Sequence, residues 1–215
     1  MIEFESAMSY LPLNGLFMNI FSKIGVIGSA LLVLSSASAI ATMPVETDMH
    51  TPATKVSDTT LENFYQVDKD LYRSGQPGVE QMQELERRGV KSIFNLRNFH
   101  TDNSEAKGTS LKLYHIPMEA GRFTEEQVIL ALKQLYHAPK PALIHCWHGS
   151  DRTGLMVAMY RMVFLGWSKQ DAIEELKKPE FGYHKWAYYN IIQYLENVDV
   201  ESIRKQVTGT AGIEQ

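Results

Sequence analysis

The stretch that decides the fold is residues 142–154, which read ALIHCWHGSDRTG. The short apolar run Ala142–His145 predicts a buried strand, and the almost wholly apolar segment from Arg152 to Gly166 predicts a helix. Between them lies a loop that begins at Cys146, the only cysteine in the chain. A cysteine therefore leaves a strand at the C-terminal edge of a sheet, and an arginine begins the helix that follows.

This strand-loop-helix arrangement predicts an anion-binding nucleophile. Backbone amides in such a loop converge on its centre, and the helix N-terminus behind them favours an oxyanion. The same donors and Arg152 favour the thiolate form of Cys146. Arg152 can hold two phosphate oxygens at once, Gly149 lets the backbone approach the anion, and the Thr153 hydroxyl can hydrogen-bond the sulfur. We expect Cys146 to attack phosphorus and form a covalent intermediate that water hydrolyses.

The order His145-Cys146, five residues, Arg152-Thr153-Gly154 resembles the phosphate-binding loop of the cysteine-dependent protein tyrosine phosphatases. Residues 71–77, LYRSGQP, and residues 94–97, FNLR, resemble the atypical dual-specificity branch of bacteria, plants and fungi. The resemblance spans roughly Phe64 to Val198. It implies catalysis by Cys146 and Arg152 with neither a metal nor an organic cofactor. The residues expected at the phosphate are Trp147, His148, Gly149, Ser150, Asp151 and Arg152, supported by His145 and Thr153.

Strands and helices alternate along the chain. Expected strands are Phe64–Val67, Leu71–Arg73, Lys91–Leu96, Leu111–Met118 and Ala142–His145. Expected helices are Val79–Arg88, a capped helix from Thr124 to a break at Pro139, Arg152–Gly166, Ser168–Lys178 and Lys185–Val207. This alternation predicts an α/β fold with a mostly parallel central sheet and helices on both faces, as in the tyrosine and dual-specificity phosphatases. The first two strands are expected at an edge of the sheet, and ligands at the C-terminal ends of the strands.

A proton donor for the leaving group is harder to find. The family resemblance implies an aspartic acid on an upstream loop, but no aspartate lies between Asn103 and Cys146. Glu119 follows the predicted strand Leu111–Met118 on the active-site side, so it is our candidate acid. Glu125, Glu126 and Asp102 remain alternatives, although carboxylates in the first turn of a helix also interact favourably with its dipole.

Other interpretations of the loop stay open. Cys146, His145 and His148 could suggest a metal site, but His145 and Cys146 are adjacent on an extended segment and point to opposite faces. His145 is therefore expected to order the loop by hydrogen bonds. Asp151 either braces Arg97 or another cation, or contacts substrate. Because the loop carries no lysine, a monophosphate ester is favoured. A non-catalytic phosphate-binding module and a rhodanese-like sulfurtransferase are the competing classes.

The N-terminus reads as an export signal. Residues 24–42 carry no charge, Lys23 precedes them, and Ala-x-Ala sites follow the apolar run, which is the pattern of a secretory signal peptide. We expect a signal at 1–41, with translation starting at Met18, because Glu3 and Glu5 suit a signal poorly. The mature protein would be periplasmic or secreted, without stable membrane insertion; the alternative is an uncleaved inner-membrane anchor.

Composition sets the remaining limits. A linker is expected at 42–60, one phosphatase domain at 61–207 and a short tail at 208–215. A single cysteine excludes an intramolecular disulfide and a cysteine-rich zinc site. The net charge is -4, which argues against a general nucleic-acid binder. The expected partner is a phosphorylated protein or small phosphate ester, and the sequence leaves the oligomeric state undetermined.

Overall fold

The computed structural model describes residues 50–209. The predicted signal peptide, the predicted start at Met18, residues 42–49 of the predicted linker and residues 210–215 of the tail lie outside the described residues. Within residues 50–209, no helix is both long and apolar enough to cross a membrane.

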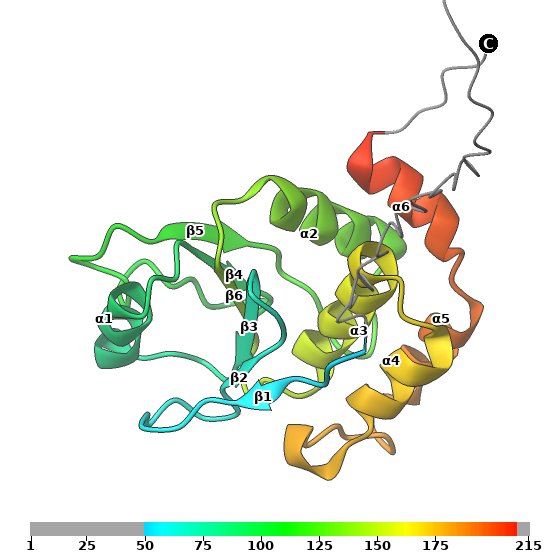
Figure 1. The fold of residues 1–215 in the computed structure, drawn as a ribbon, viewed down its shortest axis with the longest axis horizontal. Helices are drawn as coiled ribbons and strands as arrows, with labels where there is room; N and C mark the ends of the chain where they lie inside the picture. The colour runs from blue at the N-terminus through cyan, green and yellow to red at the C-terminus, as the bar shows by residue number, and fades with distance from the viewer. Residues whose placement is uncertain (1–49, 210–215) are drawn as a thin grey trace, which may run out of the picture. The chain divides into compact units, whose positions relative to one another are not determined.

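The described chain folds into short strands and mostly longer helices (Figure 1). The strands are β1 (Thr54–Lys55), β2 (Tyr65–Gln66), β3 (Leu71–Ser74), β4 (Ser92–Asn95), β5 (Lys112–His115) and β6 (Ala142–His145). The α-helices are α1 (Val79–Arg87), α2 (Glu125–His137), α3 (Asp151–Leu165), α4 (Lys169–Leu176), α5 (Tyr189–Asn197) and α6 (Val200–Thr208), and a 3-10 turn, η1, spans Pro179–Phe181.

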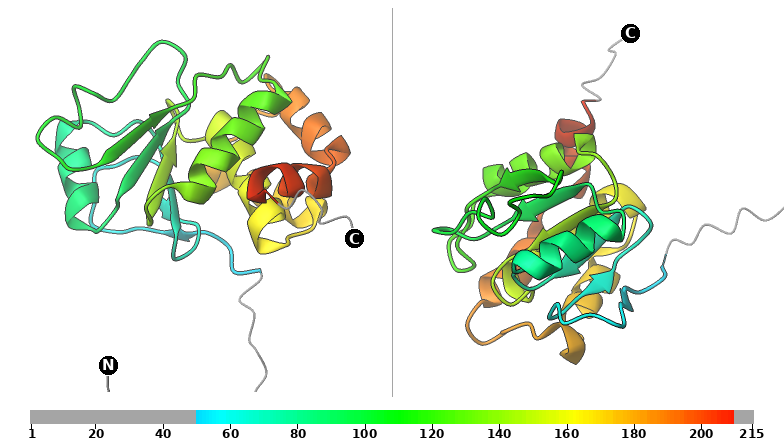
Figure 2. Two further views of the ribbon diagram at one scale, coloured as in Figure 1. Left: turned by 90° about the horizontal axis from the view of Figure 1, so that it is seen from above. Right: turned by 90° about the vertical axis from the view of Figure 1, so that its left-hand side faces the viewer.

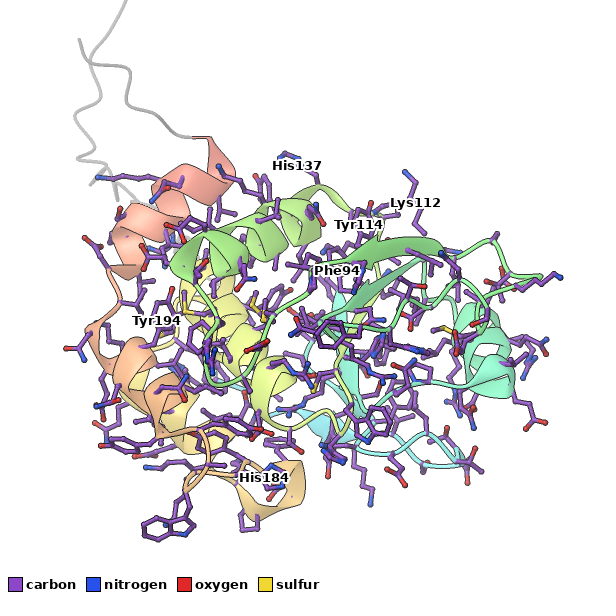
Figure 3. The ribbon with its side chains drawn as sticks, turned by 180° about the vertical axis from the view of Figure 1, so that it is seen from behind. Phe94, Lys112, Tyr114, His137, His184 and Tyr194 are labelled. Carbon is purple, nitrogen blue, oxygen red and sulfur yellow. The ribbon has the colours of Figure 1, made fainter. Side chains whose placement is uncertain are left out.

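The sheet is mixed, with the order β1-β2-β3-β6-β4-β5. The pairs β3–β6, β6–β4 and β4–β5 are parallel, whereas β1 and β2 are attached in antiparallel orientation. The expectation of a mostly parallel central sheet with helices on both faces is confirmed. Phe94 on β4 lies directly opposite Tyr114 on β5, and their rings stack with centroids 4.4 Å apart (Figure 3).

The helices divide unequally between the two faces of the sheet. One face carries α1 alone, and the other carries α3 with the remaining helices around it (Figures 1 and 2). The smaller core joins Met82 and Leu85 of α1 to Ile93 and Leu143 of the sheet. Almost every residue of α3 is buried, which explains why its sequence is apolar all round.

Parallel register brings the ends of four strands together. His145 at the end of β6 lies opposite Ser74 of β3 on one side and Asn95 of β4 on the other, and Asn95 lies opposite His115 of β5. The residues that follow these strands therefore meet at one edge of the sheet. Cys146 follows β6, which lies between β3 and β4. The loop that begins at Cys146 therefore has the segments after β3 and β4 on its two sides.

The structure corrects the edge prediction for one strand. The strand predicted at Leu71–Arg73, expected at an edge, is β3 (Leu71–Ser74) and lies inside the sheet between β2 and β6. Because β2 and β1 add on its outer side, its four residues are largely buried. β1 itself falls within residues 42–60, where a linker is expected. There Thr54–Lys55 pairs with β2, and the amide of Ala53 donates to Glu175 Oε1 at 2.9 Å.

The prediction of one long helix at Lys185–Val207 is wrong. Residues 182–188 form turns, and the chain breaks again between α5 and α6, where Val198 is extended. Asp199 begins a new helix because its side chain accepts a hydrogen bond from the amide of Ser202 at 2.9 Å. The apolar spacing continues through both helices, but the helix ends before Val198 and a second helix begins after the capping residue Asp199.

Candidate active site

The loop from Cys146 to Arg152 is held by donors that reach its carbonyl oxygens from outside. The amide of Gln76 donates to the Trp147 carbonyl at 2.9 Å, Asn63 Nδ2 to the His148 carbonyl at 3.0 Å, and Arg73 Nη2 to the Gly149 carbonyl at 2.7 Å. Because other segments bind these three carbonyl oxygens from outside the loop, the backbone amides between them remain available to a ligand inside it. Within residues 50–209, the amides of 147–150 donate no hydrogen bond to protein.

Gly149 makes this close packing possible. Its φ is +73°, a conformation that glycine adopts far more readily than other residues. A Cβ at this position would overlap the backbone of Ser74 and Gly75. The turn that begins at Ser74 and Gly75, after β3, thus packs directly against the loop.

His145 fixes the start of the loop from the buried side. Its Nδ1 lies 3.1 Å from the Cys146 carbonyl oxygen, and its Nε2 lies 2.8 Å from Asp102 Oδ2. Since a carbonyl oxygen only accepts, Nδ1 is the donor. Both ring nitrogens are occupied, so His145 is unavailable as a metal ligand and orders the loop as expected.

Asp102 is a structural carboxylate. It is buried and accepts from His145, from Asn95 Nδ2 at 2.9 Å and from Gln76 Nε2 at 2.9 Å. Burial alone would raise the pKa of Asp102, but the hydrogen bond and charge of His145, together with Gln76 and His100, lower it overall. Both oxygens of Asp102 are engaged inside the protein, so the carboxylate supports the loop and is not placed to protonate a leaving group.

Arg152 lies where the ends of the strands meet. Its Nη1 faces the carbonyl oxygen of Leu96 at 3.4 Å and that of Met118 at 3.3 Å. These long contacts orient one side of the guanidinium, and its remaining donors form no hydrogen bond with the described residues. Cys146 itself is buried at the base of the loop. A phosphate held by Arg152 and the inner amides would face the Cys146 sulfur.

Arg73 supplies a second, fully buried cation. It supports the loop through Gly149 and stacks 4.1 Å above the centre of the Phe181 ring. Burial lowers the pKa of Arg73 to about 10, against the opposing effects of Glu175, Cys146 and Tyr65. The side chain therefore stays positive at neutral pH. The sequence marked Arg73 as a strand-end arginine but gave no sign that it lies beneath the loop.

The other residues predicted at the phosphate differ in their exposure and in the contacts that they make. Trp147 is half exposed, and the Arg97 guanidinium stacks on its ring at 4.1 Å. Ser150 is buried against the Gly182 turn. The Thr153 hydroxyl is buried without a hydrogen-bond partner among the described residues, so the contact expected with the thiolate is not observed.

Asp151 binds His184 and not Arg97. The amide of His184 donates to Asp151 Oδ1 at 2.9 Å, and His184 Nδ1 lies 2.9 Å from Asp151 Oδ2. Arg97 instead donates to Gln76 Oε1 at 3.0 Å. Neither His184 nor Gln76 was marked as a site residue by the sequence. LYRSGQP contains Gln76, but nothing local marks His184.

Glu119 lies at the edge of this site. Its side chain is exposed and accepts a hydrogen bond from Asn98 Nδ2 at 3.0 Å. The carbonyl oxygen of the preceding residue, Met118, is one of the two that Arg152 contacts. Glu125 accepts from the Tyr194 hydroxyl, and Glu126 lies in the first turn of α2, where hydrogen bonds from its own amide and from Thr124 lower its pKa. Of the candidate acids, Glu119 is the one that directly follows a residue whose carbonyl contacts Arg152.

One group of potential metal ligands exists among the described residues. His100, Asp102 and Glu105 offer ligand atoms within 4.8 Å of one another. Asp102 already accepts three hydrogen bonds, including the one that orients His145. The arrangement is explained by its role in supporting the loop.

Comparison with known proteins agrees with this geometry. Dual specificity protein phosphatase TpbA from Pseudomonas aeruginosa is 34% identical over 146 residues, covering 66% of this chain and 65% of TpbA, so the chain spans slightly less than two thirds of that relative. Inositol diphosphatase DSP3 from Arabidopsis thaliana is 30% identical over 152 residues, covering 66% of this chain and 73% of that protein.

Solved structures extend the likeness to the fold. A crystal structure of a cysteine-to-serine variant of P. aeruginosa TpbA with phosphotyrosine matches with a TM-score of 0.66 and 30% identity, over 77% of this chain and 99% of that chain. The catalytic core of SIW14 from Saccharomyces cerevisiae matches with a TM-score of 0.61 and 27% identity, over 72% and 96%. The sequence pattern of the tyrosine phosphatase family itself matches residues 59–211. Since this match includes the whole loop and the strands and helices that position it, the chain belongs to the tyrosine phosphatase family.

Proposed function

We propose that this protein is a phosphatase of the tyrosine or dual-specificity type, which hydrolyses phosphate monoesters through a phosphocysteine intermediate. The observation that carries the proposal is the loop from Cys146 to Arg152. Its carbonyls are engaged from outside, its inner amides are unpaired within the described chain, and it joins a buried cysteine to an arginine with free donors. These features suit a tetrahedral anion held against a sulfur nucleophile.

The reaction uses two displacements at phosphorus. In the first, the Cys146 thiolate forms a bond to phosphorus while the bond to the ester oxygen breaks, and the leaving oxygen takes a proton from an acid. In the second, water attacks the phosphocysteine, the sulfur–phosphorus bond breaks, and the carboxylate receives the proton from water. Arg152 and the loop amides stabilise the equatorial oxygens in both steps.

We assign the acid to Glu119. It is the first carboxylate after the end of β5, and the carbonyl of Met118, just before it, contacts Arg152. Its exposure lets it reach a leaving group in the mouth of the site, whereas Asp102 is buried and triply hydrogen-bonded. A glutamate at this place departs from the aspartate implied by the family resemblance.

The decisive experiment measures p-nitrophenyl phosphate hydrolysis by the full chain and by Cys146→Ser, with and without a chelator. Hydrolysis that resists the chelator and disappears in the variant is the expected result. Vanadate or phosphate binding without hydrolysis by the wild-type chain would instead indicate a binding module. Cyanide-dependent sulfur transfer would indicate a sulfurtransferase.

Export belongs to the same proposal. The uncharged segment 24–42, Lys23 and the Ala-x-Ala sites support a cleaved signal and a periplasmic or secreted enzyme. In such an oxidising compartment, a lone cysteine has no partner within the chain with which to form a disulfide. N-terminal sequencing of the fractionated protein tests this: a mature start after Ala39 or Ala41 is expected, and a start upstream of Ala37 would contradict it.

A further inference from the structure

A cavity next to the candidate active site has no role in the reaction described above. Its volume is about 650 Å³, and it is lined by Lys177, Tyr183, His184, Lys185, Trp186 and Ala187. Most of these residues belong to the turns between η1 and α5. We call it the lysine–tryptophan cavity.

The cavity adjoins the phosphate-binding loop through His184. The amide and the ring of His184 both bond to Asp151, the residue before Arg152, at 2.9 Å. The ring of His148, a loop residue, lies with its centroid 6.1 Å from that of His184. Figure 3 shows His184 on this turn, on the opposite side of the domain from Lys112 at the start of β5. A substrate extending from the phosphate past His148 would enter the cavity.

The charge of the lining favours an anion. Two lysines face the cavity and no carboxylate lines it. In the part of the chain that the structure describes, Lys177 Nζ makes no hydrogen bond or ion pair, and Lys185 Nζ lies 5.0 Å from the centre of the Trp186 ring. Asp151, the carboxylate that His184 connects to this cavity, is already bound by that histidine. The lysines are therefore available to a negatively charged group on a ligand.

Trp186 adds an exposed apolar wall. It is 91% exposed, and Tyr189, the first residue of α5, is 54% exposed. Tryptophan and tyrosine are enriched at protein-binding surfaces, since aromatic rings give a large contact area at a small entropic cost. A chain that covers Trp186 while presenting carboxylates to Lys177 and Lys185 satisfies both features.

We propose that the lysine–tryptophan cavity binds an acidic segment of a protein substrate next to its phosphorylated residue. This inference rests on the proposed function, because it assumes that phosphate occupies the loop at Cys146. The proposal predicts that the preferred substrates are phosphoproteins with aspartate or glutamate beside the phosphorylated residue, and not small phosphate esters.

The test compares three substrates: p-nitrophenyl phosphate, a phosphotyrosine peptide flanked by aspartates, and the same peptide flanked by alanines. For the full chain we expect kcat/KM to be about tenfold higher for the acidic peptide. Lys177→Ala and Lys185→Ala should each reduce that preference about threefold, in the range of exposed ion pairs, and Trp186→Ala should lower kcat/KM for both peptides. All three variants should hydrolyse p-nitrophenyl phosphate at the wild-type rate.

Lys112→Ala is the matched control, because it removes the same charge at the start of β5, away from the strand ends that form the site. It should leave the acidic preference intact. Equal kcat/KM for the two peptides, or equal losses in the control and the cavity variants, would overturn the proposal. Activity that is instead stimulated by anionic phospholipid vesicles, and lost in Trp186→Ala, would replace the peptide with a membrane surface.

Failure of the proposed function is recognised separately. If p-nitrophenyl phosphate is not hydrolysed, the affinities of Cys146→Ser for the two peptides still test the cavity. A lower Kd for the acidic peptide, which rises in Lys177→Ala, would support the cavity without catalysis. Equal Kd values would reject it.

Discussion

At the scale of single residues, His145 links the nucleophile to the interior of the protein. One ring nitrogen reaches the Cys146 carbonyl and the other reaches Asp102, which is held in turn by Asn95 and Gln76. The carboxylate thus fixes the orientation of a ring that fixes the start of the loop. A residue 43 positions earlier in the chain than His145 controls the loop's geometry without touching phosphate.

Asp102→Asn should destabilise the protein in a pH-dependent way. The pKa of Asp102 is lower in the folded chain than its ordinary value, so its stabilisation is complete above about pH 4 and is lost as pH falls through the folded-state pKa. At pH 7 we expect the free energy of unfolding to fall by about 3 kcal/mol, as for one partner removed from a buried pair. Urea denaturation of both proteins at several pH values measures this difference in the free energy of unfolding.

The deficit of Asp102→Asn should shrink as the pH falls from about 4 through the lower folded-state pKa, because the unfolded carboxylate takes up its proton first and the folded one only below its lowered pKa. Glu62→Gln, at an exposed position, serves as the control and should show almost no deficit. A deficit of equal size at pH 7 and in acid would contradict a role for the ionised carboxylate.

The variant Glu119→Gln tests whether Glu119 donates a proton to the leaving group or only contributes a polar side chain. An acid matters most when the leaving group is poor, so hydrolysis of phenyl phosphate should fall about 100-fold. Hydrolysis of dinitrophenyl phosphate, whose leaving group departs without a proton, should change by less than about threefold. Steady-state kinetics with both substrates provide the comparison.

Glu125→Gln and Glu126→Gln are the controls for Glu119→Gln. Both residues lie in the first turn of α2 and should show no dependence on the leaving group. If Glu119→Gln lost the same factor on both substrates, Glu119 would have a positioning role and the acid would lie elsewhere.

At the scale of elements, the loop between β6 and α3 depends on the turn after β3. Gly149→Ala places a methyl group against the Ser74 carbonyl and forces a positive φ on alanine, so the loop must shift. We expect kcat/KM to fall at least about 100-fold and vanadate binding to weaken in parallel. Vanadate titration reports on the loop without requiring turnover.

Gly121→Ala is the matched substitution for Gly149→Ala, because no atom lies within 4 Å of the added methyl group and its φ is not positive. It should retain activity. Full activity in Gly149→Ala would show that the loop can form without its contact to Ser74.

Elements were predicted well where local signals agree. The cap at Thr124 forms as predicted, with Gln127 completing a capping box, and so does the buried strand before Cys146. The pattern failed where a cap interrupts a continuous apolar spacing, as at Asp199 between α5 and α6. It also missed β1, whose two exposed residues have no periodicity that could reveal a strand.

At the scale of the whole molecule, the site combines segments that are distant in sequence. Cys146 and Arg152 were predictable because one loop contains both. Arg73, Gln76 and His184 were not recognised as parts of the site, since their roles exist only after the sheet aligns β3 with β6 and α3 packs beside the turns that follow η1. Residues of this kind carry no spacing signal, because tertiary packing alone brings them to the loop.

During turnover, we expect Cys146 to carry the phosphoryl group. The most direct test is to quench the full chain in acid while it turns over a phosphotyrosine peptide, and to locate the phosphate by peptide mass spectrometry. We predict one phosphoryl group on the peptide that contains Cys146, at a higher level in Glu119→Gln with an activated substrate and absent in Cys146→Ser. Phosphate found on another residue, or turnover that persists in Cys146→Ser, would contradict the account.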